Sequence, residues 1–311
     1  MTGSILLLVP PGWGGAWQKP LSVGGIKVYA QGVDAYDRAE IRYAASFRPP
    51  PGLLASLPNL AAVFSLGAGV DGFLVDPDFP KHVPLIRFVD PTLSGEMAQF
   101  AALHVLMQHR TAAYFTAAQA ESAWRQRMLP RATADTRVGI LGLGEIGTEC
   151  AERLRDLGFA VSGWSRTRKT VAGIESHAGA GELDAFLSVC DFLICVLPLT
   201  PDTRHILNAE TFAKLPRGAY VINIARGGHL NEPDLVDALD SGHLSGATLD
   251  VFEIEPLPRE SPIWKHPRII ATPHIAAITS PIHATRSILE GIAAIESGRA
   301  PKNVVDMTRG Y

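Results

Sequence analysis

The sequence predicts an α/β protein with two domains, each built on a doubly wound parallel sheet. The chain of 311 residues is long enough for about two domains. Short apolar segments alternate with helical or turn segments in two successive series, and a glycine-rich turn opens the second. Strands that alternate with helices pair as parallel sheets joined by crossover helices. We expect residues 1–94 with 281–311 to form one discontinuous domain and residues 95–280 to form the other.

The first ninety or so residues carry five apolar segments of strand length. We predict strands at Ser4–Val9, Ile26–Ala30, Ile41–Phe47, Leu60–Phe64 and, with a weaker pattern, Leu85–Val89. Between them, Asp34–Glu40 and Gly52–Leu57 are predicted to be helical. The small-residue segment Ser65–Asp71 follows the fourth strand, at the end where open α/β sheets bind ligands. The sequence alone leaves open whether this segment is a ligand loop or an ordinary strand-to-helix turn.

Three further helices are predicted outside the strand series. Gly95–Arg110 is apolar on more than one face, which indicates a buried helix that passes between domains or into a subunit interface. A second helix is expected to carry Tyr114, Phe115 and Trp124. The last helix, about Thr279–Ser297, is expected to return to the first domain.

The stretch Arg137–Gly147, with the sequence RVGILGLGEIG, organises the second domain. Gly142, Gly144 and Gly147 match the spacing G-x-G-x-x-G between an apolar strand and a helical segment. In such turns the first glycine permits the turn, the second lets backbone approach a pyrophosphate, and the third allows close helix packing. The pyrophosphate is expected to bind amides at the helix N-terminus, where Glu145 and Ile146 lie. The motif predicts a Rossmann domain that binds a dinucleotide.

Six strands are predicted in this domain, with helices between them. They are Arg137–Leu141, Phe159–Trp164, Asp191–Leu197, Ala219–Ile224, Ala247–Val251 and Ile269–Ala271. Asn231 is predicted to cap the helix after the fourth of these strands, because acidic residues and a proline follow it in the first turn.

The end of the second of these strands indicates which dinucleotide binds. NAD enzymes commonly place a carboxylate there for the ribose 2′-hydroxyl. This chain has Trp164–Lys169, WSRTRK, with no carboxylate and three cations. Arg166 and Arg168 can grip a 2′-phosphate, and the hydroxyl of Ser165 or Thr167 can add a hydrogen bond. We therefore favour NADP over NAD, with a solvated basic loop as the alternative.

Three residues of catalytic type follow later strands of the same sheet. Arg226, Glu255 and His274 each come just past a strand, where they supply an anion clamp, a carboxylate and a group that can titrate near neutral pH. Taken singly, each has a structural explanation, such as an ion pair or a solvated turn. Together they suit the reduction of a 2-keto acid.

Composition excludes several other classes of protein. The net charge of -3 and the absence of a run of like charge argue against nucleic acid as a partner. Cys150, Cys190 and Cys195 lie in apolar patterns without metal-ligand spacing, so no metal site is expected. Ser4–Val9 is apolar but is not preceded by a basic region, which indicates a core strand and not a signal peptide. No apolar run reaches membrane-spanning length. We expect a cytoplasmic protein with reduced thiols.

Over nearly its whole length the sequence resembles the D-isomer-specific 2-hydroxyacid dehydrogenases. The closer resemblance is to the glyoxylate/hydroxypyruvate reductase A subgroup. Besides the glycine turn, it is carried by the segments Ser65–Asp71, Trp164–Lys169, Ala238–Gly242, Ser261–Pro267, Thr272–Thr279 and Arg309–Tyr311. The resemblance implies two doubly wound domains, a flavodoxin-like substrate domain and an NAD(P)-binding Rossmann domain, with the site in a cleft between them. It also implies a homodimer with contacts from the helices around residues 95–124.

The resemblance implies roles for the catalytic residues. Arg226 would bind the substrate carboxylate and polarise the ketone. His274 would donate a proton to the carbonyl oxygen while NADPH delivers hydride from nicotinamide C4. Glu255 would hydrogen-bond His274 and favour its protonated form. Backbone amides of the loop that contains Leu66, Gly67 and Ala68 would hold the other carboxylate oxygen.

Further positions that match the family would line the cofactor. These are Leu197, Pro198, Thr203, Ala225 and Asp250, the last near the nicotinamide amide. NADH would be a poorer substitute for NADPH.

Two positions depart from the family pattern. Gln99 stands where the family often has an acidic residue, with Glu96 one turn earlier, so that position is left unassigned. Phe47 stands where relatives tend to have tryptophan near the substrate, which leaves the size of the acyl pocket open. Glyoxylate and hydroxypyruvate are the expected substrates. Larger keto acids such as phenylpyruvate are the nearest alternative, and a non-catalytic nucleotide-sensing dimer is a more distant one.

Overall fold

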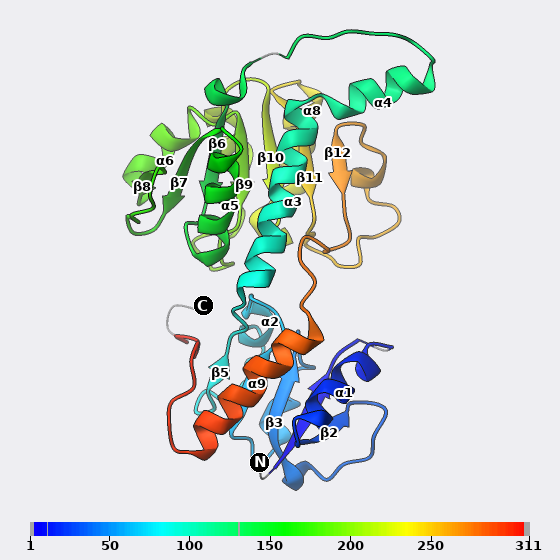
Figure 1. Ribbon diagram of the computed structural model, residues 1–311, viewed down its shortest axis with the longest axis vertical. Coiled ribbons are helices and arrows are strands. Elements are labelled where there is room, and N and C mark those ends of the chain that lie inside the picture. The colour runs from blue at the N-terminus through cyan, green and yellow to red at the C-terminus, as the bar shows by residue number, and fades with distance from the viewer. Residues whose placement is uncertain (1–2, 11, 130, 308–311) are drawn as a thin grey trace. The chain divides into compact units, whose positions relative to one another are not determined.

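The computed structural model describes residues 3–10, 12–129 and 131–307 (Figure 1). The chain divides into two compact units. Unit 1 combines the residues up to Asp90 with those from Ile278 onward, and unit 2 is Pro91–Ala277. The segment Arg309–Tyr311, which contributes to the family resemblance, lies outside the described residues. No helix of the described ranges is both long and apolar enough to cross a membrane.

Unit 1 is built on a five-stranded parallel sheet. Its strands are β1 Ser4–Leu8, β2 Lys27–Ala30, β3 Ile41–Ser46, β4 Ala62–Ser65 and β5 Leu85–Ile86. They lie in the order β2-β1-β3-β4-β5, and every pairing is parallel. This is the doubly wound order found in flavodoxin.

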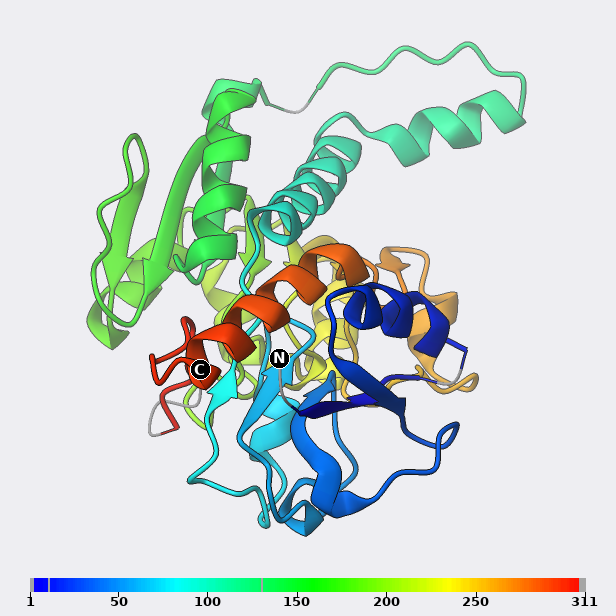
Figure 2. The same cartoon turned by 60° about the horizontal axis from the view of Figure 1, so that its bottom comes forward.

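Two helices of unit 1 lie side by side although they come from opposite ends of the chain. They are α1, Gly14–Val23, and α9, Pro281–Glu296 (Figures 1 and 2). The end of α1 approaches α9 so closely that a Cβ on Gly24 would lie 2.3 Å from a methyl carbon of Leu289. The C-terminal helix α9 therefore packs beside the N-terminal helix α1 within unit 1. The short helix α2, Asp71–Leu74, follows the loop after β4.

The helices of unit 1 differ from the sequence-based prediction. The segments predicted as helices are only short 3-10 turns, at Arg38–Glu40 and Leu54–Ser56. The first turn runs directly into β3, and the second is followed by Leu57, whose helical conformation is disfavoured by the proline after it. Helix α1 was not predicted, because its two glycines and a proline weaken the local signal. It is held by tertiary packing of Trp17 and Leu21, which are 1% and 0% exposed.

Unit 2 is built on a seven-stranded parallel sheet. Its strands are β6 Arg137–Leu141, β7 Ala160–Ser165, β8 Glu175–Ala178, β9 Phe192–Cys195, β10 Ala219–Asn223, β11 Leu244–Leu249 and β12 Ile269–Ala271. The order β12-β11-β10-β9-β6-β7-β8 is the Rossmann order with a seventh strand added. The predicted fold class, two parallel-sheet α/β domains, is confirmed. Among the strands of residues 3–10, 12–129 and 131–307, only β8 was missed, because this edge strand has the polar sequence ESHA.

The helices between these strands mostly follow the prediction. They are α5 Glu145–Asp156, α6 Ala180–Leu187, α7 Ala209–Lys214 and α8 Glu232–Asp240, with 3-10 turns at Thr133–Asp135, Gly227–His229 and Pro262–Lys265. Asn231 caps α8 as predicted, because its side chain accepts the N–H of Asp234 at 3.3 Å.

Unit 2 begins with the long helix α3, Pro91–His109, which packs against α5 (Figure 1). The sequence predicted burial of more than one face of α3. Instead its buried residues, which include Ala98, Ala101 and Val105, lie on one side, and Leu103 is 52% exposed. The next helix, α4, spans Ala112–Ala120, so it ends before Trp124. That indole lies in the following segment and is 93% exposed. Exposed apolar side chains therefore gather in the region predicted to contact a second subunit.

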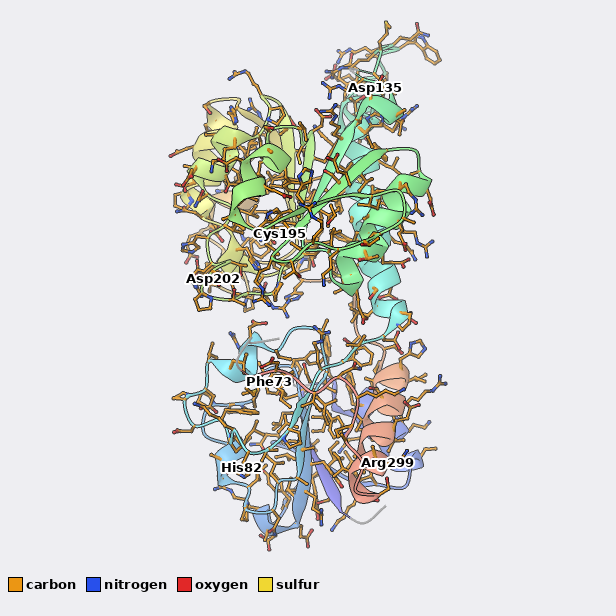
Figure 3. All side chains as sticks on the ribbon, turned by 90° about the vertical axis from the view of Figure 1, so that its left-hand side faces the viewer. Phe73, His82, Asp135, Cys195, Asp202 and Arg299 are labelled. Carbon is orange, nitrogen blue, oxygen red and sulfur yellow. The ribbon has the colours of Figure 1, made fainter. Side chains whose placement is uncertain are left out.

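Each unit has a hydrophobic core of its own. In unit 2 the strands and helices bury Leu141, Phe186, Leu193 and Cys195 completely. Figure 3 shows Cys195 at the end of β9 and Asp202 in the loop that follows that strand. The residues discussed below lie mainly in the loops that leave the carboxyl ends of these strands.

Candidate active site

The glycine turn after β6 has the conformation expected of a dinucleotide-binding turn. Gly142 adopts φ +108°, a region that favours glycine. A Cβ on Gly147 would lie 1.7 Å from the Gly142 carbonyl oxygen, so α5 can pack on the turn only without a side chain there. Gly144 caps α5 in an extended conformation, and a Cβ on it would meet no described atom within 4 Å. The backbone at Gly144 thus leaves the space that a pyrophosphate requires.

The basic loop after β7 is tied to the neighbouring edge of the sheet. The Ser165 hydroxyl donates to the carbonyl of Thr167 at 2.8 Å. Arg168 donates to the carbonyl of Ser176 in β8 and forms an ion pair with Glu182 in α6. Both arginines of the loop, Arg166 and Arg168, are exposed. A 2′-phosphate could therefore reach them without rearrangement of the core.

Glu182 is fixed in place by the backbone. Its second carboxylate oxygen accepts the N–H of Ala178 at 2.8 Å. This hydrogen bond, together with the charges of Arg168 and His177, holds the pKa of Glu182 below its usual 4.5 despite some burial. Glu182 is therefore an anionic support for Arg168 at neutral pH.

The loop after β9 carries the next predicted cofactor residues, Leu197, Pro198 and Thr203. The Thr203 hydroxyl donates to the Pro198 carbonyl at 2.7 Å and accepts the N–H of Thr200 at 2.9 Å. Leu197 is buried at 8% exposure. These contacts fold the loop back on itself and fix the direction of the Pro198 carbonyl.

Arg226 follows β10 in a tightly constrained backbone segment. Its carbonyl accepts a hydrogen bond from the Asn223 side chain at 3.0 Å, and its guanidinium donates to the carbonyl of Ala225 at 2.7 Å. A Cβ on Gly227 would lie 1.8 Å from the carbonyl carbon of Phe252. The peptide after Arg226 therefore presses against the loop that follows β11, so the position of Arg226 depends on that loop.

Glu255 and His274 form the pair predicted from the sequence. The His274 Nδ1 lies 2.8 Å from one carboxylate oxygen of Glu255, and the other oxygen accepts the N–H of Phe252 at 2.9 Å. Burial acts to raise the pKa of Glu255. The hydrogen bonds from His274 and Phe252 and the charge of Arg226 outweigh it, so the pKa falls below 4.5. An ionised Glu255 requires a proton on Nδ1, which assigns this hydrogen bond as Nδ1–H donating to carboxylate.

His274 has an unusual backbone conformation for a residue with a side chain. Its φ is +55°, and its N–H donates to the carbonyls of Asp250 at 2.8 Å and Thr272 at 3.0 Å. Left-handed backbone at a residue other than glycine is uncommon and is often found at functional sites. The imidazole remains 47% exposed, so its second nitrogen can reach a small molecule.

Asp250 holds the loop that carries His274. It is 1% exposed, and one carboxylate oxygen accepts from the Thr272 hydroxyl at 2.6 Å and the Ile275 N–H at 2.8 Å. The other oxygen accepts the Ala276 N–H at 2.8 Å. Its predicted contact with the nicotinamide amide stays a prediction. The observed contacts give Asp250 a positioning role that the sequence did not reveal.

The predicted substrate loop lies in unit 1, after β4. The Leu66 N–H donates to the Ser46 carbonyl at 2.8 Å, so this amide is already used by the sheet. The Gly67 N–H has only a 3.3 Å contact with the Ser65 hydroxyl, which itself donates to the Gly67 carbonyl at 2.8 Å. The amide of Gly67 is therefore a better candidate for a carboxylate than that of Leu66.

Trp13 is an aromatic neighbour of the predicted acyl pocket that the sequence analysis missed. Its ring stands edge-on to Phe47 at 6.1 Å between centroids, and Trp17 does the same at 5.8 Å. A Cβ on Gly67 would lie 3.7 Å from the Phe47 ring, which places these aromatics beside the substrate loop. Trp13 is 45% exposed. Trp13 is the N-cap residue of α1. A correct prediction of α1 from the sequence would therefore have placed Trp13 in this part of unit 1.

Among the described residues, no group of three or more His, Cys, Asp or Glu side chains is arranged to hold a metal ion.

Comparison with known proteins identifies the family. A family model described as "D-isomer specific 2-hydroxyacid dehydrogenase, NAD binding domain" matches residues 102–276, more than half of the chain. The chain belongs to this family of dehydrogenases. Among its members, glyoxylate/hydroxypyruvate reductase A of Serratia proteamaculans is 44% identical over 274 residues, which cover 86% of this chain and 87% of that protein. The predicted family and subgroup are confirmed.

Solved structures of family members have the same fold. The D-isomer specific 2-hydroxyacid dehydrogenase of Xanthobacter autotrophicus Py2, in complex with NADPH and MES, is 42% identical with a TM-score of 0.93 and full coverage of both chains. The NADPH-dependent glyoxylate/hydroxypyruvate reductase of Sinorhizobium meliloti, in complex with NADP and sulfate, is 39% identical with a TM-score of 0.92. The alignment covers 99% of this chain and 100% of that one.

Proposed function

We propose that the protein reduces small 2-keto acids with NADPH, converting glyoxylate to glycolate and hydroxypyruvate to D-glycerate. The observation that carries the proposal is the His274–Glu255 pair at 2.8 Å beside Arg226, in a domain with a dinucleotide-binding turn. Two similar proteins support the substrate class, since they are named as glyoxylate/hydroxypyruvate reductases.

In this reaction NADPH supplies a hydride to the keto carbon when it is bound. Arg226 binds the substrate carboxylate and draws electron density from the ketone through its guanidinium. His274 donates the proton from Nε2 to the carbonyl oxygen, because Nδ1 is directed at Glu255. Glu255 remains ionised and stabilises the imidazolium that donates the proton. The roles of Phe47 and the Leu66–Ala68 loop in substrate binding stay predictions.

The cofactor would be held by the turn and loops of unit 2. The open face at Gly144 and the amides of Glu145 and Ile146 suit the pyrophosphate, and Arg166 and Arg168 suit the 2′-phosphate. Structures of similar proteins with NADPH or NADP support this choice. NADH lacks the 2′-phosphate, so we expect it to be a poorer substitute.

We also propose a homodimer. The observation that supports it is the exposure of Leu103, Phe115, Trp124 and Met128 along α3, α4 and the following segment. Light scattering should give twice the monomer mass of 33.3 kDa. A monomer at micromolar concentration would exclude this part of the proposal.

We further propose a cytoplasmic location. Cys150, Cys190 and Cys195 are buried and unpaired, and burial raises the pKa of each thiol to about 12. Recovery of the protein in the soluble cytoplasmic fraction of its source cells would test this, and recovery from an exported fraction would contradict it.

The decisive experiment is a set of initial rates with NADPH and NADH against glyoxylate, hydroxypyruvate, pyruvate and phenylpyruvate. Fast NADPH oxidation with the two small hydrophilic acids is expected, and its loss in His274→Asn would assign the proton donor. A preference for phenylpyruvate would retain the mechanism and change the substrate class. Tight NADPH binding without turnover of any keto acid would favour the nucleotide-sensing alternative.

A further inference from the structure

His229 is a fully buried imidazole that neither the glycine motif nor the catalytic set includes. It ends the 3-10 turn Gly227–His229, directly after Arg226, and it is 0% exposed. Its Nδ1 lies 3.2 Å from the backbone nitrogen of Arg226. Its Nε2 lies 3.2 Å from the carbonyl oxygen of Pro198. One ring therefore connects the segment of Arg226 to the loop predicted to line the cofactor.

The hydrogen bonds assign the tautomer of this ring. The Pro198 carbonyl can only accept, so Nε2 carries the proton. Nδ1 also lies 3.1 Å from the Arg226 carbonyl, but that oxygen already accepts from the Asn223 side chain at 3.0 Å and the His229 N–H at 3.2 Å. The Arg226 N–H, in contrast, is directed at Nδ1. With the proton on Nε2, the ring donates to the Pro198 carbonyl and Nδ1 accepts the Arg226 N–H, while the 3.1 Å contact with the Arg226 carbonyl is not a hydrogen bond.

Each of the two segments that the His229 ring contacts, the Pro198 loop and the Arg226 segment, is also held by contacts with other residues. The Pro198 carbonyl also accepts the Thr203 hydroxyl at 2.7 Å, so His229 completes an existing arrangement of this loop. On the other side, a Cβ on Gly227 would lie 1.8 Å from the Phe252 carbonyl carbon, so the peptide after Arg226 packs directly on the loop that follows β11. The imidazole therefore joins two segments that other contacts also hold in place.

We propose that His229 is a positioning residue that sets Arg226 through Nδ1 and the cofactor loop through Nε2. This rests on the proposed function, in which Arg226 binds the keto acid and Pro198 lines the cofactor. The two roles use different nitrogens, so they can be separated by substitution. Asparagine can retain an acceptor near Nδ1, and glutamine can retain a donor near Nε2.

The test compares His229→Asn with His229→Gln. His229→Asn loses the bond to Pro198, so the Kd for NADPH should rise about tenfold while the KM for the keto acid stays within about twofold. His229→Gln loses the acceptor for the Arg226 N–H, so the KM for the keto acid should rise about tenfold with the NADPH Kd nearly unchanged. Measurement of the NADPH Kd by nicotinamide fluorescence needs no turnover.

A general loss of packing would change both constants in both variants, and that parallel result would overturn the proposal, as would no change in either. His243→Asn and His243→Gln are the matched controls. The His243 Nε2 lies 2.7 Å from the Phe212 carbonyl oxygen, and this contact does not involve the Arg226 segment or the Pro198 loop. The two controls should leave both constants unchanged. Thr203→Val removes the other donor to Pro198 and should reproduce the NADPH effect alone, even if a His229 variant does not fold.

The outcome also separates this proposal from the proposed function. If the unaltered protein binds NADPH but reduces no keto acid, the proposed function fails. The role of His229 in NADPH binding can still be tested in that case. Weaker NADPH binding in His229→Asn but not in His229→Gln would support a role for the contact with the Pro198 carbonyl. Equal NADPH binding in the two variants would overturn it.

Discussion

Replacing Glu255 by glutamine should slow the reaction without unfolding the protein. The carboxylate accepts two hydrogen bonds through different oxygens, from His274 Nδ1 at 2.8 Å and from the Phe252 N–H at 2.9 Å. Glutamine has only one acceptor oxygen, so one of these bonds is lost together with the negative charge. The lost charge-assisted bond to His274 amounts to about 1.5–3 kcal/mol. At about 1.4 kcal/mol per factor of ten, kcat/KM should fall by about 10- to 150-fold.

The assay is the initial rate of NADPH oxidation with glyoxylate, from pH 5.5 to 9, for the unaltered protein and the variant. Glu253→Gln is the matched control, because Glu253 lies two residues away, is exposed and pairs with Arg204 at 2.8 Å. Loss of an exposed ion pair costs about 0–1 kcal/mol of stability, and kcat/KM should not change. A Glu255→Gln variant whose kcat/KM stays within about threefold of the unaltered protein would refute the reasoning.

The pH profile provides an independent check. The folded-state pKa of Glu255 is lowered from 4.5, so its stabilising contribution is complete above that value and is lost as the pH falls through the lower folded value. Between pH 5.5 and 9 Glu255 therefore stays ionised and produces no change in rate. Any change in kcat/KM within this range must then come from a group other than Glu255. Full activity of His274→Asn across this range would contradict the assignment of His274 as the proton donor.

Four further variants test the cofactor and substrate assignments. Gly144→Ala should change the free energy of unfolding by less than about 0.5 kcal/mol yet weaken NADPH binding, whereas Gly147→Ala should cost more than about 3 kcal/mol because its Cβ meets backbone at 1.7 Å. Equal unfolding midpoints in denaturant titrations would contradict this. Arg166→Ala with Arg168→Ala should raise the KM for NADPH by about tenfold or more and leave that for NADH nearly unchanged. If both cofactors are affected equally, the 2′-phosphate assignment is wrong. Trp13→Ala should raise the ratio of kcat/KM for phenylpyruvate to that for glyoxylate by about tenfold, because it removes an edge-on neighbour of Phe47. An unchanged ratio would exclude Trp13 from the acyl pocket.

Local patterns were enough to predict most of both sheets. Apolar runs of strand length placed eleven of the twelve strands in the described part of the chain, because buried parallel strands are apolar on both faces. The glycine spacing placed the turn at Gly142–Gly147, since its three conformational requirements fall within six residues. Asn231 was identified as a cap because the signal lies within a single helical turn.

The features that were missed depend on contacts distant in sequence. Helix α1 is stabilised by burial of Trp17 and Leu21, which overrides its weak helical propensity. The support of Arg168 by Glu182 comes from a residue fourteen positions later, on a different element. His229 lies between glycines and a leucine with no periodic pattern, so its burial is invisible until the loops are assembled.

The catalytic groups of unit 2 share one framework of loops, and this has a consequence for mutagenesis. Gly227, next to Arg226, packs on the backbone of Phe252, and the Phe252 N–H binds Glu255. Glu255 binds His274, whose own N–H donates to the Asp250 carbonyl. A displacement at one member therefore shifts the others, and effects of substitutions in contact do not add. A double variant of Glu255→Gln and His274→Asn should be hardly slower than His274→Asn alone, because Glu255 acts on the reaction through the imidazole. Full additivity of the two losses in kcat/KM would show that Glu255 also acts by another route.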